Sequence, residues 1–282
     1  MITFRTMIPA DIPAGLSLCR HAGWNQLARD WELFLKLNPN GCRVGLDIEG
    51  NVIGTVTTLP YQNHFTWIGM VLVDPDRRRE GIGTQLLMEA LALAKHDDTV
   101  KLDATPAGRE VYLKLDFVDE YAITRMRLAR SVYNNITKFP GRPIEISDFP
   151  KILKLDRDVF GADRQLILES LFEAAPQLAF LLEEEGNLKG YCFGRPGYNF
   201  YHLGPVIAFD SRDAFRLLST VMQHNSGKEM IIDVIQHHTE FIRFASSLGF
   251  VEQRPLIRMY RGANVYPGDP KMQFAILGPE FG

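Results

Sequence analysis

The 282-residue sequence has little cysteine, no paired cysteine motif and few histidines. Its three cysteines, Cys19, Cys42 and Cys192, are an odd number and lie far apart, which argues against a disulfide framework or a zinc site. We therefore expect reduced thiols and a cytoplasmic protein. The adjacent histidines His237 and His238 are expected to point to opposite faces of a strand, so we predict no metal site.

Two further absences limit the partners. No apolar run approaches the roughly 18 residues of a membrane span, and no charged-then-apolar leader pattern opens the sequence. The net charge of −3 and the pI of about 6.2 argue against binding to nucleic acid or to a membrane surface. The hydrophobic content of 46% predicts a globular chain with one large or two ordinary domains.

The most informative segment is 71–87, where an apolar strand pattern leads into a polar turn, basic residues, glycines and a helical pattern. Backbone N–H groups in such a loop can converge on an anion at a helix N-terminus. Gly81 and Gly83 permit close approach of the backbone, and Arg78 and Arg79 can donate charge-assisted hydrogen bonds. The segment therefore predicts a pyrophosphate site.

The spacing Arg78-x-x-Gly81-x-Gly83 separates this loop from other phosphate sites. It lacks the third glycine of a dinucleotide-binding fold and the Gly-Lys-Ser/Thr of a P-loop. It resembles motif A of the GCN5-related N-acetyltransferase (GNAT) superfamily, whose loop binds the pyrophosphate of acetyl-coenzyme A (acetyl-CoA). The resemblance implies acetyl-CoA as the acyl donor, bound by Met70, Val71, Val73, Arg78, Arg79, Glu80, Gly81, Ile82, Gly83 and Thr84.

Within that family, the strand before the loop pairs with the pantetheine arm as though the arm were an added strand. The resemblance assigns this role to the backbone of Met70, Val71 and Val73. A backbone N–H there would also stabilise the oxyanion of the attacked thioester.

The segment 104–117 resembles the family's ending Tyr-x-x-x-Gly-Phe. The resemblance places Tyr112 beside the coenzyme sulfur as the general acid, and a phenol with a pKa of about 10 can protonate a thiolate. Asp116 stands where the family usually has glycine, so we expect a differently built turn there. A plain core aromatic is the alternative role for Tyr112.

No pattern identifies the general base. Asp30, His64 and Asp103 are candidates, and His64 has the most suitable ordinary pKa. Aromatic and amide groups in the loop at 22–26 suit a small polar ligand. The candidate substrate residues are therefore Trp24, Asn25, Asp30 and His64, with capping, packing or surface roles as the alternatives.

The sequence also contains an internal repeat. Leu115–Asp119 and Arg125-Met126 recur as Leu248–Glu252 and Arg258-Met259 with a shift of 133. The turns at 49–54 and 185–190 are related by a shift of 136. Between them, 68–71 recurs at 203–206 with a shift of 135. Two unrelated α/β domains with similar turns are the alternative interpretation.

The two copies differ at the predicted pyrophosphate loop and at the position of Tyr112. After 206–209 the second copy enters a helix with no Gly-x-Gly, and it has Ala245 where the first has Tyr112. We therefore predict a catalytic GNAT domain over 1–133 and a degenerate GNAT-like domain over 143–282, with the boundary near 131–143.

Periodicity predicts the fold class as α/β (α+β). The resemblance implies two tandem GNAT folds, each a mixed, mostly antiparallel twisted sheet flanked by helices. In the first half the periodicity predicts helices from Pro9 and at 30–35, 86–94 and 108–115, and strands at 43–48, 52–59, 66–73, 100–104 and 117–127.

The second half has its own resemblance. Asp158–Arg164, Arg195-Pro196-Gly197 and Leu203–Val206 resemble the carboxy-terminal domain of a bacterial tandem acetyltransferase group. Arg164 and Arg195 either shape a site that faces the first half or are paired structural arginines.

These features predict an acyl-CoA N-acyltransferase that moves acetyl from acetyl-CoA to the primary amine of a small molecule by direct attack in a ternary complex. The second half is expected to complete the substrate pocket. The alternatives are another acyl group or a protein amine, a non-catalytic acyl-CoA sensor or assembly module, and a general nucleotide-binding protein. The sequence does not predict the oligomeric state.

Overall fold

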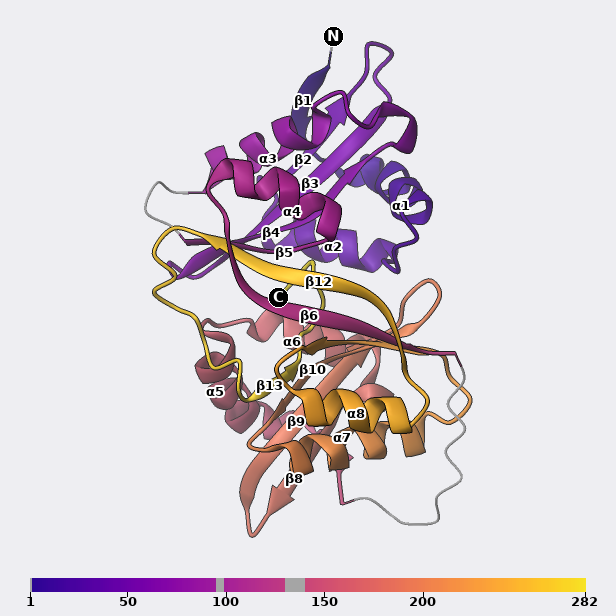
Figure 1. Cartoon of the computed structure of the whole chain (residues 1–282), viewed down its shortest axis with the longest axis vertical. Coiled ribbons are helices and arrows are strands. Elements are labelled where there is room, and N and C mark those ends of the chain that lie inside the picture. The colour runs from indigo at the N-terminus through magenta and orange to yellow at the C-terminus, as the bar shows by residue number, and fades with distance from the viewer. Residues whose placement is uncertain (1, 95–98, 130–139) are drawn as a thin grey trace.

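The computed structural model describes residues 2–94, 99–129 and 140–282 of the chain (Figure 1). In the first half the elements are β1 (Thr3–Thr6), α1 (Ile12–His21), α2 (Ala28–Leu37), β2 (Cys42–Leu46), β3 (Val52–Tyr61), β4 (Phe65–Val73), α3 (Ile82–Leu93), β5 (Thr99–Ala104), α4 (Pro106–Tyr112) and β6 (Val118–Leu128). In the second half they are β7 (Arg142–Pro143), α5 (Phe149–Phe160), α6 (Gln165–Ala174), β8 (Phe180–Glu184), β9 (Asn187–Arg195), β10 (Tyr201–Ala208), α7 (Ser211–His224), β11 (Met230–Ile235), α8 (Thr239–Ser247), β12 (Val251–Arg261) and β13 (Gln273–Ala275).

The predicted elements of the first half are present, with shifts of a few residues at their ends. The turn after α4 corrects one expectation. Asp116 adopts the left-handed conformation (φ 63°), as does its counterpart Gly249 (φ 96°). Aspartate tolerates this conformation better than most residues. The expectation of a differently built turn is therefore wrong, because both copies use a left-handed residue there.

The described strands form one sheet in which the two halves exchange strands. The order is β1-β2-β3-β4-β5-β12-β6-β11-β13-β10-β9-β8-β7. Strand β12 of the second half pairs antiparallel with both β5 and β6, and β6 of the first half pairs antiparallel with β11. Figure 1 shows β6 and β12 side by side across the middle of the molecule. Each half therefore contributes one long strand to the sheet of the other.

A pair of equivalent ion pairs accompanies the exchange. Arg125 on β6 donates two hydrogen bonds of 2.7 Å to Asp233 on β11. Arg258 on β12 donates bonds of 2.8 and 2.9 Å to Asp103 on β5. All four side chains are buried. Because Arg125 and Arg258 are equivalent in the repeat, the same bidentate contact is made twice, each time between the halves.

Helices cover both faces of this sheet. On one face, α3 packs on the first half's strands, and α7 and α8 pack on those of the second. On the other face, residues of α1, α2, α5 and α6 belong to one common hydrophobic core. In that core the ring of Phe34 stacks on Phe281, with centroids 4.6 Å apart. The halves therefore share a core as well as a sheet.

The short strand β13 fills a gap in the second half. Strands β10 and β11 pair in parallel only from Tyr201 to Leu203, and β13 then lies between them. At Gly204 an added Cβ would lie 2.0 Å from the carbonyl oxygen of Ile276, so only glycine lets the chain after β13 pass this closely. The segment 276–282 continues from β13 to the first half, where Trp67 donates to the carbonyl of Pro279 at 3.0 Å.

The structure shows where the cysteines and the adjacent histidines of the sequence analysis lie. The three cysteines are buried free thiols. His237 and His238 lie in the turn after β11, so the expectation of a strand is wrong there; the Nε2 atoms of both rings contact the carbonyl oxygen of Pro270. Among the described residues, no group of three or more potential metal ligands gathers, and no helix is long and apolar enough to cross a membrane. Most of the predicted boundary at 131–143 lies outside the described residues.

The reciprocal ion pairs predict a specific pattern of stability losses. Asp233→Asn leaves the buried Arg125 guanidinium without a countercharge, so we expect the free energy of unfolding to fall by about 3–5 kcal/mol. As the control, Asp119→Asn breaks the solvent-exposed pair with Arg109 and should cost about 1 kcal/mol or less. Urea unfolding of the three proteins measures both values. Equal losses for the two variants would contradict a special role for the exchanged-strand pairs.

Candidate active site

The predicted pyrophosphate loop connects β4 to α3. Asp74 accepts a 3.0 Å hydrogen bond from the N–H of Asp76, which forms the first turn of the loop. Arg79 and Gly81 both have positive φ, 69° and 80°, and α3 begins at Ile82 directly after Gly81. The first N–H groups of α3 have no partner within the helix, and Gly81 supplies no side-chain cap. The helix N-terminus is therefore open toward an anion.

The charges of this loop favour the same ligand. Glu80 is bound by Arg77 at 2.9 Å, and this hydrogen-bonded guanidinium lowers the pKa of the Glu80 carboxyl. Arg78 and Arg79 are exposed and form no ion pair with any residue that the structure describes. The two guanidinium groups therefore stay available for a phosphate, beside a carboxylate that is already neutralised.

Strand β4 has a free edge next to this loop. It pairs in parallel with β5 only from Phe65 to Trp67, and the described residues of the two strands then diverge. A bulge in the pairing with β3 places Met70 at φ 52°, with its carbonyl oxygen held by Thr55 Oγ1 at 2.8 Å. The backbone of Met70, Val71 and Val73 thus lies on the strand segment that has no partner from β5, as a pantetheine site would require.

The second half has neither feature. Residues 209–210 connect β10 to α7, whereas 74–81 connect β4 to α3. Asp210 caps α7 by accepting a 2.8 Å hydrogen bond from the N–H of Asp213. A carboxylate therefore occupies the helix N-terminus where the first half has an open loop, and β13 lies in the gap that corresponds to the free edge of β4. These contacts give a physical reason for the predicted degeneracy of the second copy.

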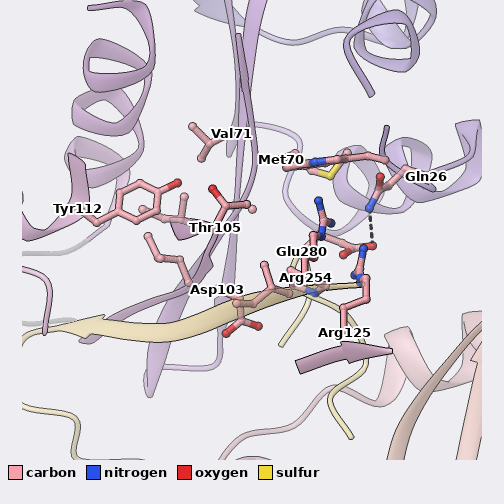
Figure 2. A pocket seen from close by; sticks show the side chains of 15 residues that line it. Gln26, Met70, Val71, Asp103, Thr105, Tyr112, Arg125, Arg254 and Glu280 are labelled. Atoms are coloured by element: carbon pink, nitrogen blue, oxygen red, sulfur yellow. Dashed lines mark hydrogen bonds between the residues drawn. The ribbon is translucent and has the colours of Figure 1, made fainter. Parts of the chain in front are cut away.

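A narrow cavity opens beside the bulge of β4 (Figure 2). Residues of both halves line it: Trp24, Gln26, Ile68, Gly69, Met70, Val71, Leu102, Asp103, Thr105, Tyr112, Arg125, Arg254, Leu256, Pro279 and Glu280. In Figure 2, Tyr112 and Thr105 lie on one side, while Gln26, Glu280, Arg125 and Arg254 lie on the other. The second half therefore contributes to the wall of the cavity.

Tyr112 ends α4 and directs its ring to this cavity (Figure 2). The helix is held in place by its N-cap, Thr105, whose hydroxyl accepts a 3.2 Å bond from the N–H of Gly108. Burial raises the pKa of Tyr112 to about 12. The phenol therefore keeps its proton at neutral pH and can act as a hydrogen-bond donor toward the cavity.

Glu280 is a carboxylate that the sequence did not suggest. Its backbone packs on β4, where a Cβ on Gly69 would lie 2.7 Å from the Glu280 carbonyl oxygen. Its Oε1 accepts hydrogen bonds from Arg195 and, at 3.0 Å, from Gln26. Its Oε2 accepts none from the residues that the structure describes. One oxygen is thus anchored by two donors, and the other has no donor among the described residues.

The predicted substrate residues divide into two groups. Trp24 lines the cavity. Asn25 instead joins the halves, because its side chain bonds the backbone of Asn199 and Phe200. Asp30 is buried, accepts from Arg195 at 2.5 Å and caps α2 through the N–H of Leu27. These contacts favour structural roles for Asn25 and Asp30.

The other base candidates are not free in the cavity. His64 precedes β4, contacts the carbonyl oxygen of Gly161 at 2.8 Å and stacks on Tyr266. Met70 lies six positions further along the chain, a distance of roughly 20 Å in a strand. Asp103 does line the cavity, but both of its oxygens are bound by Arg258. The structure therefore does not bring His64 to the site.

The two arginines singled out in the second half are both paired. Arg164 binds Asp156 and the carbonyl oxygen of Gly282. Arg195 reaches across to the first half and binds Asp30 in addition to Glu280. Arg195 therefore supports the cavity wall indirectly, by holding one of its carboxylates.

Comparison with known proteins agrees with this geometry. The model of the "Acetyltransferase (GNAT) family" matches residues 15–117, and that of the "Acetyltransferase (GNAT) domain" matches residues 152–275. The chain is a tandem member of the GNAT superfamily. Two copies of one fold therefore explain the repeat, and the alternative of unrelated domains is excluded.

Individual relatives cover nearly the whole tandem protein. The chain is 25% identical to the holothin acyltransferase of Pseudoalteromonas sp. (strain SANK 73390), over 92% of this chain and 87% of that one. A putative acetyltransferase from Pyrococcus horikoshii has a TM-score of 0.82 at 22% identity, covering 100% of this chain and 96% of the other. A tandem GNAT protein from the clavulanic acid biosynthesis pathway has a TM-score of 0.64 at 16% identity, covering 92% and 98%. The two structures support the fold of both halves.

The loop geometry predicts which substitution would weaken binding of acetyl-CoA, the donor that the GNAT resemblance implies. Gly81→Asp places a carboxylate at the open N-terminus of α3, where it would compete for the N–H groups and repel a pyrophosphate. We expect acetyl-CoA affinity, measured by calorimetry, to fall at least about tenfold, or about 1.4 kcal/mol. The matched control is Gly186→Asp, because Gly186 has the same φ (79°) and an equally open surrounding, but lies in the β8–β9 turn. Unchanged binding in Gly81→Asp would contradict a pyrophosphate site at this loop.

Proposed function

We propose that the protein is an acyl-CoA N-acyltransferase that transfers an acetyl group from acetyl-CoA to the primary amine of a small molecule. The observation that carries the proposal is the free edge of β4, which runs from the cavity to the open N-terminus of α3. A pantetheine arm paired with this edge would have its pyrophosphate on the loop and its thioester beside Met70. The GNAT relationship of both halves supports the same donor substrate.

The groups around the cavity suit the proton transfers of the reaction. The carboxylate of Glu280 takes a proton from the ammonium group of the acceptor, and the free amine attacks the thioester carbonyl carbon. A backbone N–H at the β4 bulge stabilises the oxyanion. The carbon–sulfur bond then breaks, Tyr112 donates its proton to the departing sulfur, and the proton still on the attacking nitrogen restores the phenol. The products are the amide and free coenzyme A, and Glu280 releases the proton that it took from the ammonium group to solvent.

Glu280 is preferred to the other acidic residues as the base on geometric grounds. Its Oε2 accepts no hydrogen bond from the described residues, whereas both oxygens of Asp103 and both of Asp30 are bound. It also lies against Gly69, next to the residues assigned to the thioester. A base must reach the proton that it abstracts, so position is the first requirement.

The role of Tyr112 can be tested by removing its hydroxyl. Tyr112→Phe should lower kcat about a hundredfold or more, because the sulfur then leaves without a proton donor. The Kd for acetyl-CoA should change less than about twofold, since the ring and its packing remain. Tyr260→Phe, at a tyrosine that does not line the cavity, is the control. Rates come from thiol release with an amine found by screening. Full activity in Tyr112→Phe would refute the general-acid role.

The role of Glu280 predicts a change in the pH profile. Glu280→Gln keeps the shape of the side chain but cannot accept a proton, so we expect kcat/KM to fall about a hundredfold. A limb of the wild-type pH–rate profile that reports this base should vanish in the variant. Asp30→Asn is the matched control, because it also removes a carboxylate from Arg195 but lies outside the cavity. Equal losses and unchanged profiles in both variants would mean that Glu280 only supports Arg195.

A further inference from the structure

Arg254 occupies an unfavourable position for a structural arginine. A bulge in β12 shifts the pairing with β6 between Glu252 and Arg254, and this shift sets Arg254 directly opposite Arg125. Like charges at directly opposite positions on neighbouring strands destabilise a sheet. The bulge also changes the direction of the Arg254 side chain, as bulges commonly do beside active sites. Arg254 therefore lines the cavity (Figure 2).

The two arginines differ in their partners. Arg125 is neutralised by the bidentate contact with Asp233. Arg254 has no hydrogen bond or ion pair with any residue that the structure describes, and its buried Nε has no acceptor. Burial and the nearby Arg125 lower the pKa of Arg254 to about 10, which still leaves the guanidinium charged at neutral pH. A partly desolvated cation without a countercharge therefore faces the cavity.

The two arginines also line a second cavity. The second cavity is lined by Gly23, Asn25, Arg125, Phe200, Ile231, Gln253 and Arg254. The cavities have volumes of about 60 and about 110 Å³. Both are well below the ~300 Å³ at the lower end for pockets of drug-sized ligands, so the occupant is small. Trp24 and Gln26 face the first cavity, and Gly23 and Asn25 face the second, so the loop at 22–26 borders both.

We propose that Arg254 binds a carboxylate of the acyl acceptor, so that the acceptor is a small amino acid with its amine at Glu280 and its carboxylate at the guanidinium. This proposal rests on the proposed acyl transfer. A planar guanidinium matches a carboxylate through two parallel hydrogen bonds. Among the described residues that line the cavity, Arg254 is the cation without a countercharge, and Asp103 and Glu280 also line it, so a singly charged carboxylate fits better than a phosphate dianion.

The test compares amino acids with their own carboxamides, which differ only in the charged group. Protein saturated with coenzyme A is titrated by calorimetry with α-, β-, γ- and longer amino acids and with the matching amides. We expect at least one acid to bind ten or more times tighter than its amide. With acetyl-CoA in place of coenzyme A, the same acid should release thiol with at least a tenfold higher kcat/KM.

Variants of Arg254 test whether its side chain causes the preference for an amino acid over its carboxamide. Arg254→Gln should remove the difference between acid and amide, and Arg254→Lys should keep part of it, because the charge remains without the bidentate geometry. Arg261→Gln is the matched control, at an exposed arginine on the same strand. Acetyl-CoA affinity should be unchanged in all three variants, and this confirms that each is folded.

Two results would overturn the inference: no acid preferred over its amide by the wild type, or a preference that survives Arg254→Gln. Failure of the proposed acyl transfer looks different. In that case the acids still bind in preference to the amides, but no amine releases thiol from acetyl-CoA. The binding measurements with amino acids and their carboxamides therefore test whether Arg254 binds a carboxylate, even if no turnover is observed.

Discussion

Two buried arginine–aspartate pairs connect the halves of this chain. A buried guanidinium without a countercharge costs several kcal/mol, so the strand that carries it must lie beside its aspartate. Arg125 on β6 has its aspartate on β11 of the second half, and Arg258 on β12 has its aspartate on β5 of the first. Both pairs lie between the halves because the two long strands cross. The strand order β5-β12-β6-β11 carries residues of β12 into the cavity.

The course of the segment 273–282 depends on the same exchanged sheet. Once β10 and β11 have diverged, β13 can pair between them, and the chain leaves in the direction of the first half. Gly204 and Gly69, which are equivalent in the repeat, let it pass close to β10 and then to β4. The hydrogen bond from Tyr61 to the carbonyl of Phe281, at 2.6 Å, fixes its position near the end. Glu280 is thereby held beside the bulge of β4, although its place in the sequence is far from every element of the first half.

The features that could be predicted from the sequence are those formed within one continuous segment of the chain. A strand, a glycine loop and a helix start are encoded within 71–87, and the spacing of Tyr112 from Asp116 is encoded in one helix and its turn. The repeat of Arg125-Met126 at Arg258-Met259 was visible, but a repeat does not say which copy of a strand pairs with which sheet. Glu280 and Arg254 stand outside every motif, and they reach the cavity only through the strand exchange and the path of the C-terminal segment. The equivalence of Gly69 and Gly204 was the one sequence feature connected to that path.

The two copies of the fold differ chiefly in what fills the gap between two diverging strands. In the second half the gap holds β13, so a pantetheine arm has no strand edge to pair with. A pyrophosphate loop there would have no ligand to bind, and Asp210 can stabilise α7 as an ordinary cap. In the first half the corresponding edge of β4 is free, and a carboxylate at the start of α3 would repel the proposed donor. Loss of the glycine loop in one copy and its retention in the other therefore follow from a single structural difference, the position of β13.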